Sequence, residues 1–142
     1  MKIIIAFLFL SIPGLTFGQT GKCYKGTINH KIKVTFYLEG LNEGTNADPV
    51  IGSYQYDKGN GYILLNGHKN NDGDISLIEL SSANFTGTFL GTFKKNKITG
   101  RWISANQKED YPFELTEVVA DDRQLSDFKN AILNKASEFR NY

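Results

Sequence analysis

The chain has 142 residues, of which 40% are hydrophobic and 13% aromatic, and this size and composition predict one globular domain with its own core. Its 16 basic and 15 acidic residues nearly cancel, so there is no electrostatic case for binding nucleic acid or an anionic membrane surface. The single cysteine, Cys23, excludes an intramolecular disulfide, so stability has to come from packing.

The N-terminal residues have the pattern of a secretory signal peptide. Lys2 precedes the apolar run 3–12, and a Pro-Gly turn and a small-residue site lead to Gln19. The run is too short for a permanent anchor, so we expect cleavage before Gln19, a secreted or periplasmic protein and no membrane span. Because Cys23 lacks a small residue immediately upstream, we do not expect a lipoprotein. In an oxidising compartment Cys23 could link two copies of the chain in a dimer.

Alternating apolar and polar residues predict eight short strands after this leader. The longest loop, Glu39–Pro49, is rich in glycine, asparagine and acidic residues. Short turns between successive strands favour an all-β fold, an eight-stranded antiparallel meander that closes into a barrel-like sheet. In chain order the expected strands are 24–30, 32–38, 50–56, 62–67, 74–80, 85–93, 98–103 and 111–116.

The stretch Phe85–Ile103 predicts a hairpin with a defined register. Phenylalanine and glycine alternate with threonine and leucine in its first half, so they share one face. Because residues directly opposite each other point to the same face, we choose the register that keeps apolar side chains together. It sets Phe93 opposite Ile98, Gly91 opposite Gly100 and Phe89 opposite Trp102. We further expect Tyr111 beside Trp102 and Phe113 across Gly100, as the ring that covers this glycine.

A different periodicity begins at Asp121. Apolar residues then recur at spacings of three and four, which predicts an amphipathic helix with Asp121 or Asp122 as its N-cap. We expect this helix to dock on the sheet or to plug one end of the barrel. The expected organisation is therefore a signal peptide at 1–18, a barrel-like domain at 19–120 and a C-terminal helix at 121–142.

A series of short motifs over about 24–115 resembles a small all-β domain of secreted and periplasmic proteins from Bacteroidota-type bacteria. The motifs include Tyr24-x-Gly26-x-Ile28, Gly52-x-Tyr54-x-Tyr56, Leu77-x-Glu79, Gly87-x-Phe89-x-Gly91, Gly100-x-Trp102 and Pro112-Phe113-x-Leu115. The barrel-like form is loosely similar to lipocalins and avidins, and the repeated Gly-polar-apolar tripeptides are weakly similar to MORN repeats. The resemblance implies the fold and export, and it brings no activity and no functional residues.

We considered a metal site and an enzyme centre and rejected both. The segment His68–Glu79 partly fits an EF-hand calcium loop, but histidine is a poor first ligand and strands, not helices, flank it. Asn-Asn-Asp-Gly within it predicts a hairpin turn instead. His30 and His68 lack partners at metal-binding spacing, so we expect no metal and no cofactor. No nucleophile elbow, phosphate loop or Ser-His-Asp set is present in the sequence, so we expect a protein that is not an enzyme.

The aromatic residues give the leading functional hypothesis, a binding domain for a small apolar or glycan-like ligand. Tyrosines 37, 54, 56, 62 and 111 could line a cavity, although strands also favour tyrosine for packing alone. We select as candidate ligand-binding residues Tyr37, Tyr54, Tyr56, Tyr62 and Trp102. The alternative is a protein–protein interaction module, such as an inhibitor of an extracellular enzyme, acting through Glu39–Pro49. A closed barrel whose interior is filled by Phe and Trp would rule out the small-ligand hypothesis and favour this alternative.

Overall fold

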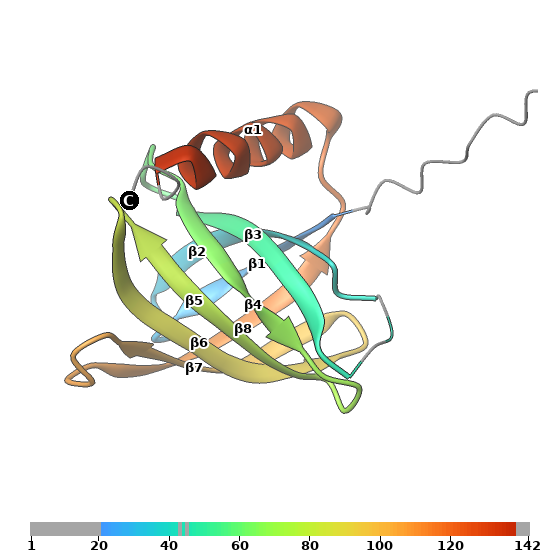
Figure 1. Cartoon of the computed structure of the whole chain (residues 1–142), viewed down its shortest axis with the longest axis vertical. Helices are drawn as coiled ribbons and strands as arrows, with labels where there is room; N and C mark the ends of the chain where they lie inside the picture. The colour runs from blue at the N-terminus through green and yellow to red at the C-terminus, as the bar shows by residue number, and fades with distance from the viewer. Residues whose placement is uncertain (1–20, 43, 45, 139–142) are drawn as a thin grey trace, which may run out of the picture.

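The computed structural model describes residues 21–42, 44 and 46–138, and the predicted signal peptide at 1–18 lies outside them. Eight antiparallel strands follow one another around a closed barrel, and one helix comes after them (Figure 1). The predicted fold class is therefore confirmed. The elements are β1 (Lys22–Ile28), β2 (Ile32–Glu39), β3 (Asp48–Tyr56), β4 (Ile63–Lys69), β5 (Asp74–Ser81), β6 (Asn84–Lys94), β7 (Lys97–Ser104), β8 (Asp110–Val118) and α1 (Asp122–Glu138).

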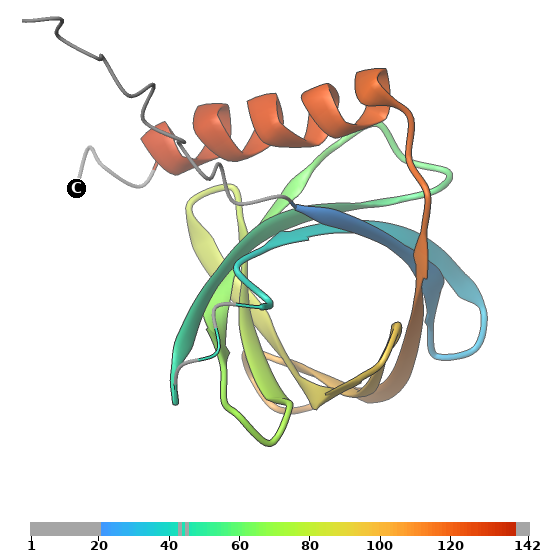
Figure 2. The ribbon, with the colours of Figure 1, turned by 90° about the vertical axis from the view of Figure 1, so that its right-hand side faces the viewer.

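Each strand pairs with the next, and β1 pairs with β8 to close the ring (Figure 2). The predicted register of the β6–β7 hairpin is confirmed at all three positions, and Tyr111 lies opposite Trp102 as expected. Most strand bounds differ from the expected ones by one or two residues, and β1 ends at Ile28 and not at His30. Asn29 and His30 have positive φ values of 52° and 58°, which ends the extended conformation before the turn.

Phe113 pairs with Gly100 across the β7–β8 ladder, as predicted. The Phe113 ring lies against the neighbouring Gly91, where an added Cβ atom would come within 2.9 Å of Phe113 Cζ and 2.5 Å of the Thr99 carbonyl oxygen. At Gly100 a Cβ would collide with the carbonyl oxygen of Leu90. Both glycines therefore allow a close approach of the neighbouring backbone, and Gly91 also leaves room for a ring.

The interior of the barrel is filled at its centre by aromatic rings. Phe36 and Tyr54 stack with centroids 4.6 Å apart, and Phe89 meets both of them edge to face, at 5.2 and 5.6 Å. On its other side Phe89 contacts Phe113 in the same way, at 5.2 Å. All four side chains are buried, so this middle layer leaves no space for an enclosed ligand.

The turns divide the barrel into two ends. We call the end formed by turns 29–31, 57–62, 82–83 and 105–109 the mouth end. The opposite end is closed by Leu41, which joins the interior cluster, and by an ion pair between Asp48 and Lys69 at 3.3 Å. Both partners of this pair are buried.

The helix α1 lies along the outside of the barrel and does not plug either end (Figure 2). Phe128 and Ile132 pack on an outward-facing cluster that includes Tyr37, Leu64 and Cys23. Asp121 is the N-cap, because its Oδ1 accepts a hydrogen bond from the backbone N–H of Gln124 at 2.8 Å. In the described part of the chain, no helical segment has the length and apolar content that crossing a bilayer requires.

The position of Cys23 bears on the suggested disulfide-linked dimer. Only 2% of this residue is exposed, beneath α1, and burial raises the pKa of its thiol to about 11 against the smaller opposing effect of Lys25. A bridge to a second copy would require α1 to leave the barrel. The folded barrel therefore gives no support to a dimer through Cys23.

Cys23 should instead report on the docking of α1. We expect Phe128→Ala to raise the rate at which a thiol reagent such as DTNB labels folded protein by about tenfold or more, since losing a buried ring weakens the docked state by about 3 kcal/mol. Leu133→Ala is the matched control, because Leu133 lies on the same helix and is exposed. Equal labelling rates in both variants and the wild type would contradict this account of how α1 is held.

Candidate functional site

A pocket of about 290 Å³ opens at the mouth end of the barrel. Its residues come from the end of β1 and the turn after it, the end of β3, the starts of β2 and β8, the body of β7 and the loop before β8. The volume is at the lower limit for ligand pockets, which fits a small molecule or one group of a larger one. It is lined by Ile28, Asn29, Ile32, Tyr56, Trp102, Glu109 and Tyr111.

Three aromatic rings line this pocket. Trp102 and Tyr111 are neighbours across the β7–β8 ladder and are parallel to within 7°, with centroids 5.9 Å apart. Tyr111 donates a hydrogen bond from its hydroxyl to Glu109 Oε1 at 3.2 Å, and this bond raises the pKa of Tyr111. Tyr56, at the end of β3, supplies the third ring and is exposed. The rings therefore offer π surface to a ligand at the mouth.

Beneath the rings lies Glu79, a carboxylate that is only 4% exposed. It accepts hydrogen bonds from the Tyr54 hydroxyl at 2.5 Å, the Thr86 hydroxyl at 2.6 Å and Trp102 Nε1 at 3.0 Å. Burial and the Glu79 charge raise the pKa of Tyr54, which keeps its phenol protonated as a donor. The Tyr54 hydroxyl is also 3.4 Å from that of Tyr56. Through these bonds Glu79 holds Trp102 directly and reaches Tyr56 through Tyr54.

The indole of Trp102 reaches Glu79 by lying across Gly87. A Cβ atom at this position would come within 2.5 Å of Nε1 and 2.8 Å of Cε2 of Trp102. Only glycine leaves that space, so Gly87 on β6 lets the ring settle against the strand. The alternation of glycine and phenylalanine in β6 thus makes room for the Trp102 ring at the pocket.

The charged side chains that line the pocket or lie directly beneath it are acidic. Glu79 makes no ion pair with any described residue, and the pairs of the described chain lie elsewhere. The one charged lining residue is Glu109, while the lysines on neighbouring turns are exposed and do not line the pocket. The pocket therefore combines aromatic faces with the negative charge of Glu109 and Glu79, while Lys31, Lys58 and Lys108 carry positive charge on the surrounding turns.

The structure places the five aromatic residues selected from the sequence in different environments. Tyr56 and Trp102 line the pocket, and Tyr54 lies buried below it. Tyr37 and Tyr62 do not line this pocket, because both pack beneath α1 on the outside and contact the Phe128 ring, at 6.0 and 5.2 Å. Tyr37 follows the inward-facing Phe36 directly, so strand alternation turns it outward.

Sequence reasoning missed Glu79 and Glu109. A signal for Glu79 was present, since it falls in phase with Ile75 and Leu77 and therefore had to point into the barrel. An acid at an inward position requires partners, and it is therefore a candidate site residue. Glu109 sits in a polar loop, where nothing in the sequence distinguishes it from its neighbours.

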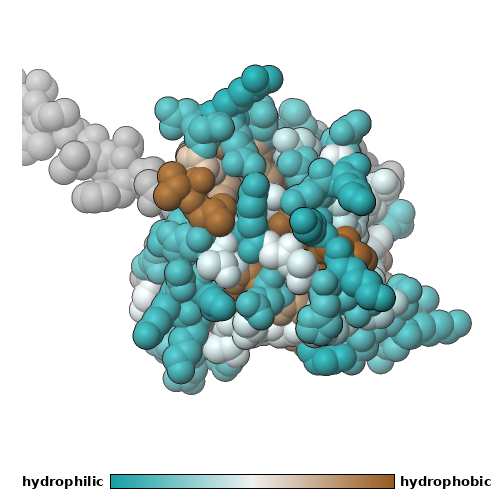
Figure 3. All heavy atoms as spheres, turned by 180° about the vertical axis from the view of Figure 1, so that it is seen from behind, coloured by the Kyte–Doolittle hydropathy of each residue, from teal (hydrophilic) through white to brown (hydrophobic). Residues whose placement is uncertain are grey.

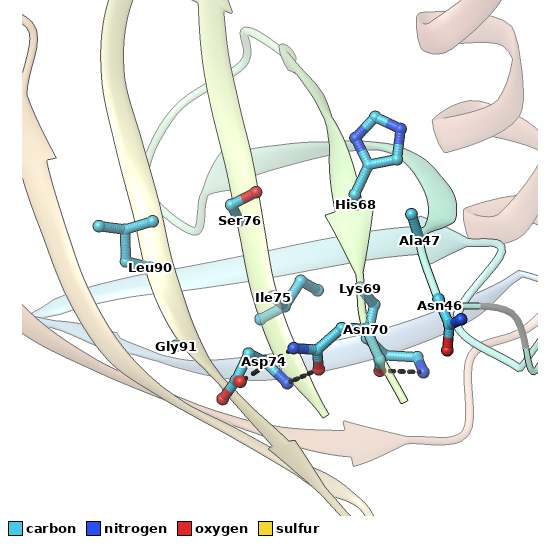
Figure 4. A pocket seen from close by; sticks show the side chains of 10 residues that line it. All are labelled: Asn46, Ala47, His68, Lys69, Asn70, Asp74, Ile75, Ser76, Leu90 and Gly91. Atoms are coloured by element: carbon cyan, nitrogen blue, oxygen red, sulfur yellow. Dashed lines mark hydrogen bonds between the residues drawn. The ribbon is translucent and has the colours of Figure 1, made fainter. Parts of the chain in front are cut away.

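Another pocket, of about 350 Å³, lies over the outer surface of β4, β5 and β6 (Figure 4). Its side chains come from these three strands and from residues 46–47 before β3, with His68, Ser76 and Leu90 projecting from successive strands. At its edge Asn70 and Asp74 hydrogen-bond each other at 3.0 Å within the hairpin turn that the sequence predicted. Its polar groups do not converge on one point, so we do not choose it as the site.

No group of three or more His, Cys, Asp or Glu side chains that could hold a metal ion occurs among the described residues. Glu79, which would be the last ligand of the EF-hand-like segment, is bound instead to Tyr54, Thr86 and Trp102 inside the barrel. That segment is therefore a hairpin turn followed by a strand.

No protein-family model, curated protein or solved structure matches this chain.

Proposed function

We propose that this protein is a non-enzymatic binding domain that works outside the cytoplasm and holds a small ligand at the mouth of its barrel. The observation that carries this proposal is the set of three rings, Tyr56, Trp102 and Tyr111, around one pocket. Such rings stack on apolar rings and on the C–H faces of sugars, so the ligand is small and apolar or glycan-like. The signal-peptide pattern at 1–18 supports the location.

The rigidity of the site supports the same proposal. A binding site loses less affinity to ordering when its side chains are already fixed before the ligand arrives. Trp102 is fixed by Glu79 on one edge and by the surface of Gly87 below it. The filled centre of the barrel limits the ligand to the mouth, which makes this a shallow site.

A second candidate is a protein–protein interaction module, such as an inhibitor of an extracellular enzyme. The filled interior favours it, because a barrel without an enclosed cavity has to use its surface. The loop between β2 and β3 is anchored by the buried Leu41 and Asp48, while Asn42 and Asn46 are exposed. However, the back of the molecule is mainly hydrophilic, with apolar surface only in small separate areas (Figure 3). This argues against a large apolar interface on that face.

Native mass spectrometry of protein purified from its own host tests the proposal. We expect the wild type to carry a bound small molecule and Tyr56→Ala to lose it, since this change removes one ring of the pocket. Phe85→Ala is the control, because Phe85 is an exposed ring outside the pocket. A wild type without a small molecule, or a molecule retained by Tyr56→Ala, would refute the proposed site. A copurified protein in place of a small molecule would support the second candidate.

A further inference from the structure

We infer that the pocket at the mouth selects an organic cation, a ligand that presents a quaternary or alkylated ammonium group. The inference rests on the proposed function, a small ligand held by the rings of this pocket, and adds that the ligand carries a positive charge. Its basis is the combination of aromatic rings, buried negative charge and the absence of a cation among the described lining residues.

The rings supply the first attraction. The face of an aromatic ring carries negative potential, and a cation above tryptophan or tyrosine gains about 0.5–2 kcal/mol, depending on its desolvation. Tyr56, Trp102 and Tyr111 all line the pocket, and Trp102 and Tyr111 are nearly parallel. Methyl groups on the nitrogen match such walls better than a strongly hydrated ion does.

The carboxylates of Glu79 and Glu109 supply the second attraction. Glu79 carries its charge below the Trp102 ring and bonds its N–H, and the donors around this carboxylate are neutral. Hydrogen bonds stabilise the carboxylate but do not cancel its field, and low-dielectric surroundings transmit that field to the pocket. Glu109 adds a carboxylate at the rim, where the Tyr111 hydroxyl orients it.

The same charges work against other ligands of similar size. A fatty acid or a phosphate would bring negative charge toward two carboxylates and would find no cation in the pocket lining. Such like charges disfavour binding. A neutral apolar group would use the rings alone and would gain nothing from Glu79 or Glu109. The mouth thus favours cations over neutral molecules and neutral molecules over anions.

Three probes of nearly the same shape test this order of affinities. They are choline, its neutral isostere 3,3-dimethylbutan-1-ol and the anion 3,3-dimethylbutanoate, compared at constant ionic strength. Trp102 is the single tryptophan of the chain, so its indole N–H gives one NMR signal that reports on the pocket. We expect choline to bind at least about tenfold more tightly than the alcohol, a difference of about 1.4 kcal/mol, and the anion to leave the signal unchanged.

Variants separate the charge effect from the shape of the pocket. Glu109→Gln keeps the shape and should reduce the preference for choline over the alcohol by a factor of about two to five. Glu114→Gln is the control, because Glu114 lies on the outer face of β8, and it should leave the preference unchanged. Equal affinity for choline and the alcohol would overturn the cation inference and leave the small-ligand function standing. No response to any of the three probes would overturn both.

Discussion

Replacing Phe89 by alanine is expected to lower the free energy of unfolding by about 3–5 kcal/mol, the largest loss for any single ring in this barrel. Phe89 is fully buried and makes edge-to-face contacts with three other rings, Phe36, Tyr54 and Phe113. The change therefore removes both buried area and three aromatic pairs, and closed-barrel packing limits how far the neighbours can fill the cavity.

Urea unfolding, followed by circular dichroism, measures this loss. Leu90→Ala is the matched control, because the residue next along the same strand points outward and is 47% exposed. We expect that control to change the free energy of unfolding by no more than about 0.5 kcal/mol. If Phe89→Ala were no more harmful than Leu90→Ala, the central ring layer would not be the main source of stability.

Replacing Glu79 by leucine is expected to cost about 2–4 kcal/mol, although it removes a buried charge. The apolar side chain leaves the hydroxyls of Tyr54 and Thr86 and the N–H of Trp102 without their acceptor. Unpaired buried donors lose the full free energy of hydration, which outweighs the gain from removing one carboxylate. Glu79→Gln keeps one carbonyl oxygen and should therefore lose less.

Two measurements show whether Glu79 positions the pocket as well as stabilising the fold. Urea unfolding gives the stability, and the indole N–H chemical shift of Trp102 gives the state of its hydrogen bond. We expect both the free energy of unfolding and the indole N–H chemical shift to change in the two Glu79 variants. In Glu114→Gln the indole shift should stay constant and stability should change by less than about 1 kcal/mol, because that side chain is 62% exposed and its ion pair is with Lys97, which is also exposed. An unchanged indole shift in Glu79→Leu would show that Glu79 does not hold Trp102.

Strand patterning in the sequence was enough to predict the barrel and even part of its register. In β6 and β7, phenylalanine and tryptophan had to share a face, and only one register allows this without mixing them with Arg101. The same alternation carried no information on which glycine a ring covers. The Phe113 ring lies against Gly91, which is not its pairing partner, because a side chain's direction depends on its rotamer and on its neighbours as well as on its pairing partner.

The pocket was harder to predict than the fold. Tyr56 and Trp102 were identified as amphipathic rings in strands, but the same argument also selected Tyr37 and Tyr62, which serve the helix interface. Composition cannot tell a ring beneath a helix from a ring at a barrel mouth, since both sites favour tyrosine. The distinction depends on where α1 docks, and that contact joins segments far apart in the sequence.

The closure between β1 and β8 sets an order on how this chain can fold during its synthesis. Until residue 118 is available, β1 has no second partner, and the open sheet exposes an unpaired edge on each side. The outward cluster around Tyr37 and Leu64 stays uncovered even longer, because Phe128 and Ile132 are made after all eight strands. Folding therefore has to wait for the C-terminal end of the chain, and a polypeptide truncated before α1 should aggregate rather than remain as a stable smaller barrel.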